Sequence, residues 1–445
     1  MLALRAILFS GNHKHHMEPI GYIASGIFIF GYILIAFEQK LSSHRSAIAL
    51  LLGTALWFIV ALYFAHAPEK LKHAVETTGA ELFGVVAFCL AAMALVEILS
   101  HYGFFDMIKA QLVRIKVGPR KQFAIMMFIL FWISSFLSNI AMTVAMIHIA
   151  RKFFKGHNLM VAACAIVVLA NAGGAWSPIG DVSTVLLWLN DKFTVWEVVS
   201  NALVPTMALG LITCGLLYKK MNDEDFIEDI TGTNRTRFSL SERAIVGTAI
   251  ASFFLPLGMN AIGLPPYFGL LFGLGLTWAM IEFAKVGSRT PHQTHLTADV
   301  EHLVQTIDTA SIKFLIGVLL AASALTALGV SDFFASLFGE QPSDSHLILA
   351  GIGAGLLSAF GVENTAVVAM TIDTLPTADP RIWSLVALTV GTGASAVMTG
   401  SSAGIIAAGM VKSMTFYKYY KIVTWPMLLG FAAAILVWLF QYWLI

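Results

Sequence analysis

Apolar runs of membrane-spanning length recur along the whole chain and alternate with short polar connections. In the first part of the chain these runs cover residues 20–37, 47–65 and 82–99, and each approaches the roughly 20 residues that a transmembrane helix needs. Residues 104–121 carry too many charges to cross a bilayer, so this segment is predicted to form an amphipathic helix at the surface. The pattern therefore predicts an all-α polytopic membrane protein.

Polar residues interrupt the middle of the next apolar run, 123–150, at Ser134, Ser135, Ser138 and Asn139. Lysines and arginines flank both ends of this run, and basic flanks favour the cytoplasmic side of a membrane. The run is therefore predicted to enter the membrane and return on the same side, as a re-entrant helical hairpin with Ser138 and Asn139 at its tip. Such a tip needs an enclosed, wet cavity, because unpaired backbone groups are costly in lipid.

The run at 160–189 contains residues that end a helix, namely Gly173, Gly174, Pro178 and Gly180. A broken transmembrane helix is therefore predicted, and Asp181 stands where the helix starts again. A carboxylate at membrane depth costs roughly 2.5 to 3.5 kcal/mol on insertion scales, so Asp181 is a candidate functional group. The alternative is a structural role, in which Asp181 only caps the helix that follows. The two roles are compatible, and with Ser183 and Thr184 the carboxylate offers oxygen ligands for a hard cation or a proton.

The second half of the chain repeats this order after a polar linker at 221–243, which is predicted to be solvated. Apolar runs at 244–259, 267–283 and 314–328 precede a run at 347–372 that Glu363 and Asn364 interrupt. The flanks of this last run hold aspartates and no lysine, so its hairpin is predicted to enter from the opposite face. The chain is thus divided into an N-terminal tail at 1–18, a first repeat at 19–220, a cytoplasmic linker at 221–243 and a second repeat at 244–445.

The two halves can also be aligned residue by residue. Asn364 follows Asn139 by 225 residues, and an offset of 220 residues places Gly180 on Gly400 and Asp181 on Ser401. With hairpins of opposite sidedness, this alignment predicts two inverted-topology repeats, each with a re-entrant hairpin and a broken helix, and a binding site between them at the midplane. We expect oxygen donors from Asn139, Asp181, Ser183, Thr184, Asn364, Ser401 and Ser402, together with carbonyl groups freed near Gly173 and Gly393.

Composition agrees with the pattern. The chain is 58% hydrophobic and only 12% charged, whereas soluble domains have about 25% charged residues. A net charge of +1 argues against a nucleic-acid partner.

Three stretches carry a family resemblance: Asn171-Ala-Gly-Gly-Ala-Trp-Ser-Pro-Ile-Gly-Asp-Val-Ser-Thr, the Val96-Glu97-Ile98 stretch ending near His101, and Gly391-Thr-Gly through Gly400-Ser-Ser-Ala-Gly404. They resemble the NhaD-type sodium/proton antiporters of the ion transporter superfamily, over most of the chain from about residue 20. The resemblance implies a transporter of a bacterial inner membrane that extrudes Na⁺ or Li⁺ as protons enter, without a cofactor. It leaves open whether the protein forms a homodimer. It implies functional positions at Asn139, Asn171, Asp181, Ser183, Thr184, Asn364 and Ser401.

The chain departs from this family at the hairpin tips. The family usually has Asp before Asn in the first tip, where this chain has Ser138, while the second tip has Glu363 before Asn364. We therefore expect Glu363 to be a titrating or electrostatic member of the site. A buried carboxylate can be neutralised by a proton or by Na⁺, but not favourably by both. That competition at Asp181 is the predicted basis of antiport.

Two further residues stand at the end of the third apolar run. Glu97 and His101 are equally consistent with a pair that snorkels to the surface and with a proton relay.

Two other functions fit parts of the pattern. A Na⁺-coupled carrier of carboxylates or inorganic anions would also use helix N-termini, but the hairpins and broken helices offer only acids, Asp181 and Glu363, and no cation partner. An intramembrane protease built on Asp181 would need a second catalytic group, and the chain has neither a Tyr-Asp pair nor a His-Glu-x-x-His motif. The sequence therefore predicts a transporter rather than an enzyme.

Overall fold

The computed structural model describes residues 18–36, 45–115, 117–227, 239–287, 307, 309–339, 342–360 and 362–444. Within these ranges every named element is a helix, and one isolated bridge joins Phe154 to Phe226. Seven of the described helices are long and apolar enough to cross a membrane, or eight if the bent pair α12 (Leu240–Ser252) and α13 (Leu255–Ala261) is one span. The prediction of an all-α polytopic fold is confirmed.

The first half contains the predicted hairpin and broken helix. Helices α7 (Pro119–Ile133) and α8 (Asn139–Phe153) form the arms of the first hairpin, and residues 134–138 form its tip. Helix α9 (Gly156–Ala175) then ends at the glycines, and the chain starts again as α10 (Val182–Leu189) before α11 (Val195–Tyr218). The break lies where glycine and proline make a helix costly.

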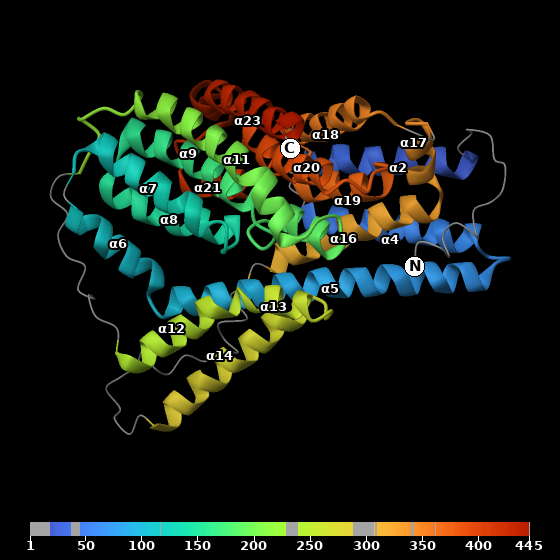
Figure 1. The fold of residues 1–445 in the computed structure, drawn as a ribbon, viewed down its shortest axis with the longest axis horizontal. Coiled ribbons are helices and arrows are strands. Elements are labelled where there is room, and N and C mark those ends of the chain that lie inside the picture. The colour runs from blue at the N-terminus through green and yellow to red at the C-terminus, as the bar shows by residue number, and fades with distance from the viewer. Residues whose placement is uncertain are drawn as a thin grey trace.

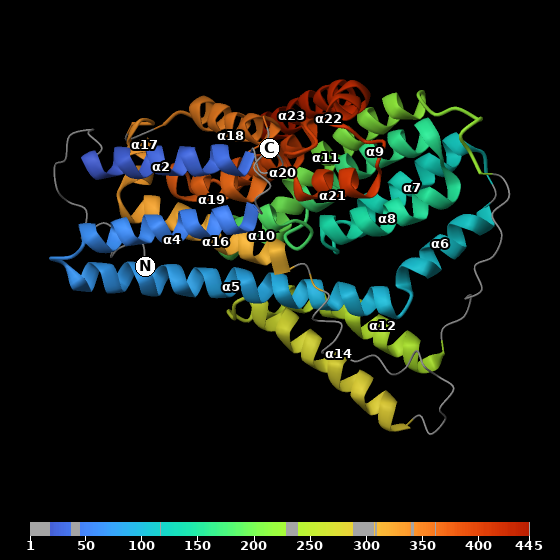
Figure 2. The same ribbon diagram turned by 180° about the vertical axis from the view of Figure 1, so that it is seen from behind.

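The second half has the same order of elements. Helices α18 (Asp344–Ala359) and α19 (Asn364–Thr374) form the second hairpin. The second broken helix consists of α20 (Pro380–Gly393), the 3-10 turn η1 (Ala394–Ala396) and α21 (Ser402–Met410). The chain ends in α22 (Phe416–Tyr419), the π-helical η2 (Tyr420–Thr424) and α23 (Trp425–Leu444). From opposite ends of the long axis, the two hairpins point toward the middle of the molecule (Figures 1 and 2).

Equivalent glycines lie against equivalent hairpins in the two halves. Gly173 faces the carbonyl of Phe131, and Gly393 faces the carbonyl of Gly355, so closely that neither position has room for a Cβ atom. A Cβ atom on Gly180 would lie 2.8 Å from the Ser134 carbonyl, and one on Gly400 would lie 3.1 Å from the Ser358 carbonyl. The repeated order of elements is therefore matched by repeated contacts, whereas the inverted orientation of the two repeats stays a prediction.

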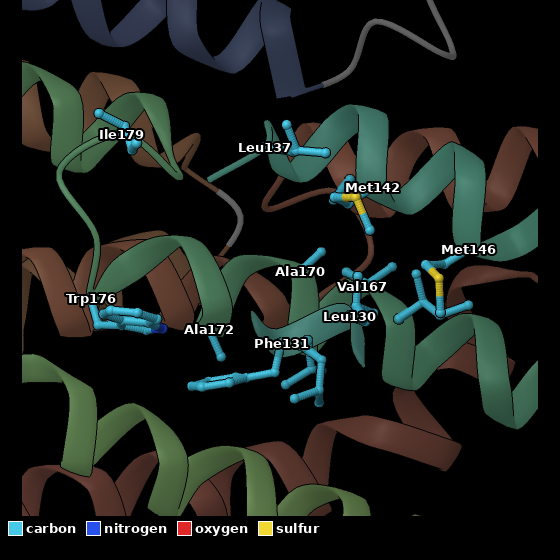
Figure 3. Packing of buried hydrophobic residues seen from close by; sticks show 14 of the residues in the cluster. Leu130, Phe131, Leu137, Met142, Met146, Val167, Ala170, Ala172, Trp176 and Ile179 are labelled. Carbon is cyan, nitrogen blue, oxygen red and sulfur yellow. The ribbon is translucent and has the colours of Figure 1, made fainter. Parts of the chain in front are cut away.

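Apolar side chains pack against the end of α9, where the first broken helix is interrupted. The rings of Phe131 on α7 and Trp176 at the end of α9 stack with 6.3 Å between their centroids and 24° between their planes. Figure 3 shows this pair beside Leu130, Val167 and Ala172. Because such packing is dense, the end of α9 is held at a defined position relative to the hairpin.

The remaining helices are α2 (Pro19–Ala36), α4 (Arg45–Tyr63), α5 (Pro68–His101), α6 (Phe104–Ile115), α14 (Tyr267–Gly287), α16 (Thr309–Ala327) and α17 (Val330–Ser336). Helix α4 packs along α16 and against α2, and α5 runs beside α14 and α12. Helix α5 extends along the long axis, between α12 and α14 on one side and the rest of the bundle on the other (Figure 1). Helix α6 covers only residues 104–115 of the segment predicted as one surface helix, because residues 119–121 already belong to α7.

Three further segments differ from the predictions. The run at 82–99 is only the second part of α5, which has 34 residues. The run at 244–259 is not one straight span, because α12 and α13 meet at a 40° bend just before Pro256, which has no N–H to donate. The linker begins docked rather than solvated, since the amide of Lys155 donates to the Asp225 carbonyl at 3.0 Å and that of His157 to its carboxylate at 3.0 Å. Most of the predicted tail, 1–17, and the middle of the linker, 228–238, lie outside the described residues.

Candidate ion-binding site

Asp181 lies between the two parts of the first broken helix. It occupies the residue before α10, with extended backbone angles of φ −133° and ψ 143°, and its exposed fraction is 4%. Its side chain does not make the usual capping hydrogen bond to α10, although the backbone amides of Val182 and Ser183, at the start of that helix, stabilise the carboxylate. The structural role at the start of α10 is therefore compatible with the functional one, and the functional role stays a prediction.

Both hairpin tips reach this carboxylate. Asn139, the first residue of α8, donates from Nδ2 to Oδ1 of Asp181 at 2.8 Å. Asn364, the first residue of α19, donates from Nδ2 to Oδ2 at 3.3 Å, and the Ser183 hydroxyl also donates to Oδ2. All three donors are neutral, so the carboxylate is oriented by hydrogen bonds without being neutralised.

Asn171 connects the two broken helices. Its Oδ1 accepts from Asn139 Nδ2 at 2.9 Å, and its Nδ2 donates to the hydroxyls of Ser395 at 2.8 Å and Ser401 at 3.1 Å. Ser401 is thus in the network at the position that the alignment pairs with Asp181. Ser395 was missed in the sequence, although it lies between Gly391 and Gly400 in the second motif.

Two further residues are relevant to ion binding: Thr184, whose hydroxyl has no partner among the described residues, and Gly391, which has no side chain. Thr184 is fully buried, and within the described part of the chain its Oγ1 has no hydrogen-bond partner. Gly391 on α20 presents only its backbone, and a Cβ atom there would lie 3.7 Å from Oδ2 of Asp181. Carboxylate, amide and hydroxyl oxygens are the donors that hard cations prefer, so this donor set suits a small cation such as Na⁺. The predicted carbonyl ligands near Gly173 and Gly393 stay a prediction.

Glu363 and Ser402 belong to a neighbouring cluster rather than to direct contacts of Asp181. Glu363 accepts from the amide of Thr365 at 2.9 Å and from its hydroxyl at 3.3 Å, so it caps α19. Ser402 accepts from Nη2 of Arg45 at 3.4 Å. Arg45 was missed because, at the start of an apolar run, it has the pattern of a flanking loop residue.

Glu97 and His101 are not brought to Asp181. Glu97 lines a cavity of about 530 Å³ between α5, α6 and α8, together with Ser100, Ser138, His148 and Lys152. His101 is exposed and does not line this cavity. The cavity reaches Ser138, the residue before Asn139 in the chain. A proton relay through Glu97 and His101 stays a prediction.

Comparison with known proteins gives relatives over nearly the full chain. A family model described as "Citrate transporter" matches residues 32–391. Sodium/proton antiporter 2 of Arabidopsis thaliana is 30% identical over 425 residues, which are 93% of this chain and 98% of the relative. The Na(+)/H(+) antiporter NhaD of Alkalimonas amylolytica is 25% identical over 457 residues, 94% of this chain and 90% of the relative.

Among solved structures, the YdaH transporter of Alcanivorax borkumensis, whose crystal structure is described as revealing an unusual topology, is similar in fold. The TM-score is 0.55 at 15% sequence identity, and the match covers 90% of this chain and 99% of that one. At this identity the similarity shows a shared fold alone.

Proposed function

Since the chain belongs to the citrate transporter family, we propose that it is a secondary transporter that exchanges Na⁺ for H⁺ across a membrane. The resemblance to NhaD-type antiporters is confirmed by relatives of that name over 94% of the chain. Membership of a transporter family and the seven or eight apolar spans identify a multi-pass membrane protein and leave no support for the protease alternative.

One observation carries the proposal. The Asp181 carboxylate is buried, and its recorded hydrogen bonds come from Asn139, Asn364 and Ser183, none of which carries a charge. Among the described residues, none of the recorded ion pairs involves Asp181. Because a buried carboxylate without a counter-charge is costly, a proton or a cation must neutralise it.

Competition between the two follows from that requirement. A proton on Asp181 removes the charge that attracts Na⁺, and a bound Na⁺ disfavours the proton by charge repulsion. Asn139 and Asn364 come from opposite hairpins, so movement of one half against the other would open the site to each side in turn. Li⁺ binds to the same kinds of oxygen donor, so we propose that the protein transports Li⁺ as well as Na⁺.

Arg45 favours a second candidate function, the coupled transport of a carboxylate such as citrate. The sequence offered no cation partner for an anion, but Arg45 lies within hydrogen-bond distance of Ser402 in the second broken helix. However, Arg45 and Glu363 interact electrostatically, so a carboxylate of the protein already offsets part of this positive charge. An anion would have to displace that carboxylate, so we place cation exchange first.

The cellular setting and the assembly are also proposals. The relatives include bacterial and plant proteins, and we propose a bacterial inner membrane for this chain. The halves at 19–220 and 244–445 would be the moving units, joined by the linker on the cytoplasmic side. Whether two chains form a homodimer is a separate question, which the mass of the purified protein in detergent would answer.

The test is transport by the purified protein in proteoliposomes that contain a pH-sensitive dye. After an acid-inside gradient is imposed, external Na⁺ or Li⁺ is expected to release protons from the lumen, whereas K⁺ and citrate are not. Empty liposomes control for leakage. Proton movement that requires citrate, or none with any cation, would contradict Na⁺/H⁺ exchange.

A further inference from the structure

The two halves of the site each hold one carboxylate, but on different elements. In the first half Asp181 precedes α10 and Ser138 is at the hairpin tip. In the second half Ser401 precedes α21 and Glu363 is at the hairpin tip. If both carboxylates bound exchangeable cations, the carrier would hold two ions per cycle, so the surroundings of each acid decide the stoichiometry.

These surroundings differ in charge. The recorded hydrogen bonds to Asp181 come from neutral groups, as described above. Glu363 accepts hydrogen bonds from Thr365 and also lies in the electrostatic fields of Arg45 and Asp181. The second carboxylate therefore has a positive side chain of the protein nearby, and this charge partly offsets the repulsion from Asp181.

Arg45 is held in this position by two further contacts. Its Nη2 lies 3.4 Å from the Ser402 hydroxyl, across 357 residues of sequence, and its guanidinium carbon lies 5.2 Å from the centre of the Phe314 ring. Cation–π contact and a hydrogen bond both orient the planar group. A guanidinium stays protonated at any physiological pH, so this charge cannot be given up during transport.

We propose that Arg45 is a fixed internal cation, which stands in the second half of the site where a second Na⁺ would otherwise bind, so that the carrier binds one Na⁺, at Asp181. This inference rests on the proposed Na⁺/H⁺ exchange and specifies its stoichiometry. Glu363 then does not exchange ions. Its negative charge balances Arg45 and keeps the guanidinium from repelling Na⁺ at Asp181.

Equilibrium binding of radioactive Na⁺ to purified protein in alkaline buffer tests the proposal. The wild type is expected to bind one Na⁺ per chain, and Arg45→Gln two, because Glu363 loses its counter-charge. The double variant Arg45→Gln/Glu363→Gln is expected to bind one ion, because it lacks the second carboxylate. Arg45→Lys is also expected to bind one ion, because it keeps a positive charge at this position. Arg243→Gln is the matched control, since Arg243 is an exposed arginine in the first turn of α12, and it should keep one ion.

The results separate this inference from the proposed function. If the wild type binds no Na⁺, the proposed function itself is contradicted. A wild type with two ions, or a folded Arg45→Gln with one, overturns only the inference. If Arg45→Gln does not fold, the double variant Arg45→Gln/Glu363→Gln decides, because it removes both charges together: one ion per chain supports the fixed-cation role, and loss of Na⁺ binding shows that Glu363 is a ligand and overturns it.

Discussion

Nδ2 of Asn364 lies 3.3 Å from Oδ2 of Asp181, although 183 residues separate the two in the chain. This hydrogen bond joins the tip of the second hairpin to the broken helix of the first half. Asn139 reaches the other oxygen of the same carboxylate at 2.8 Å. A change of charge on Asp181 therefore acts on both halves of the protein at once.

Removing the charge of Asp181 is expected to abolish exchange. Asp181→Asn keeps the size of the side chain but leaves no group that binds Na⁺ and H⁺ in turn, whereas Asp181→Glu should keep weakened activity. Asp191→Asn is the control, because Asp191 is exposed and its φ of 54° suits asparagine equally well. Dye-based proton transport in proteoliposomes measures all three. A well-folded Asp181→Asn that exchanges at the wild-type rate would move the coupling site to Glu97 or Glu363.

Thr184→Val is expected to weaken Na⁺ binding without loss of stability. The buried hydroxyl has no recorded partner in the described residues, so replacing it by a methyl group removes an ion ligand and no protein hydrogen bond. We expect the KM for Na⁺ to rise roughly tenfold, equivalent to about 1.4 kcal/mol. Thr143→Val is the contrast, since Thr143 donates to the Asn139 carbonyl at 2.7 Å and its loss should lower the melting temperature. An unchanged KM in Thr184→Val removes Thr184 from the site.

Glu363→Gln is expected to shift the pH profile of exchange toward lower pH. The substitution removes the negative charge by which Glu363 repels the Asp181 carboxylate, which favours the ionised form of Asp181, so a lower pH is needed to protonate it. The rate of proton release, measured across a series of buffers, gives the profile. The same profile as the wild type would leave Glu363 with only its capping role on α19.

Gly391→Ala is expected to reduce Na⁺ affinity while the protein still folds. The added methyl group would lie 3.7 Å from Oδ2 of Asp181 and 3.2 Å from the Ala175 methyl, so it takes space beside the carboxylate at a small packing cost. Gly79→Ala on α5 has open space around it and serves as the control. Titration of transport against Na⁺ compares the two, and equal KM values would show that the ion does not approach from the Gly391 side.

The sidedness of the hairpins can be tested by cysteine labelling. Lys121 and Lys152 are exposed at the two outer ends of the first hairpin, and Ser343 is exposed at the outer end of the second. With a membrane-impermeant maleimide, cysteines at Lys121 and Lys152 are expected to react from the cytoplasmic side and a cysteine at Ser343 from the other. The unsubstituted protein gives the background of its three native cysteines. Opposite labelling of Lys121 and Lys152 would mean a true crossing and exclude the inverted repeat.

Interruptions of apolar sequence were sufficient to place the main local features. Gly173, Gly180 and Pro178 predicted the break before Asp181, and polar residues predicted the tips at Asn139 and Asn364. These features are visible in sequence because a polar residue or a helix-breaking residue at membrane depth carries a cost of several kcal/mol in lipid. The acid and the two asparagines were therefore identified without a structure.

Only the tertiary structure decided which other groups surround them. Arg45 meets Ser402 across 357 residues, and Asn171 meets Ser395 across 224. Neither pairing follows from periodicity, because each depends on how α4, α16 and the two broken helices pack in three dimensions. A cation at the start of an apolar run has the same local pattern whether it faces solvent or the site. Packing alone distinguishes these cases, since it determines which charges are close enough to act on one another.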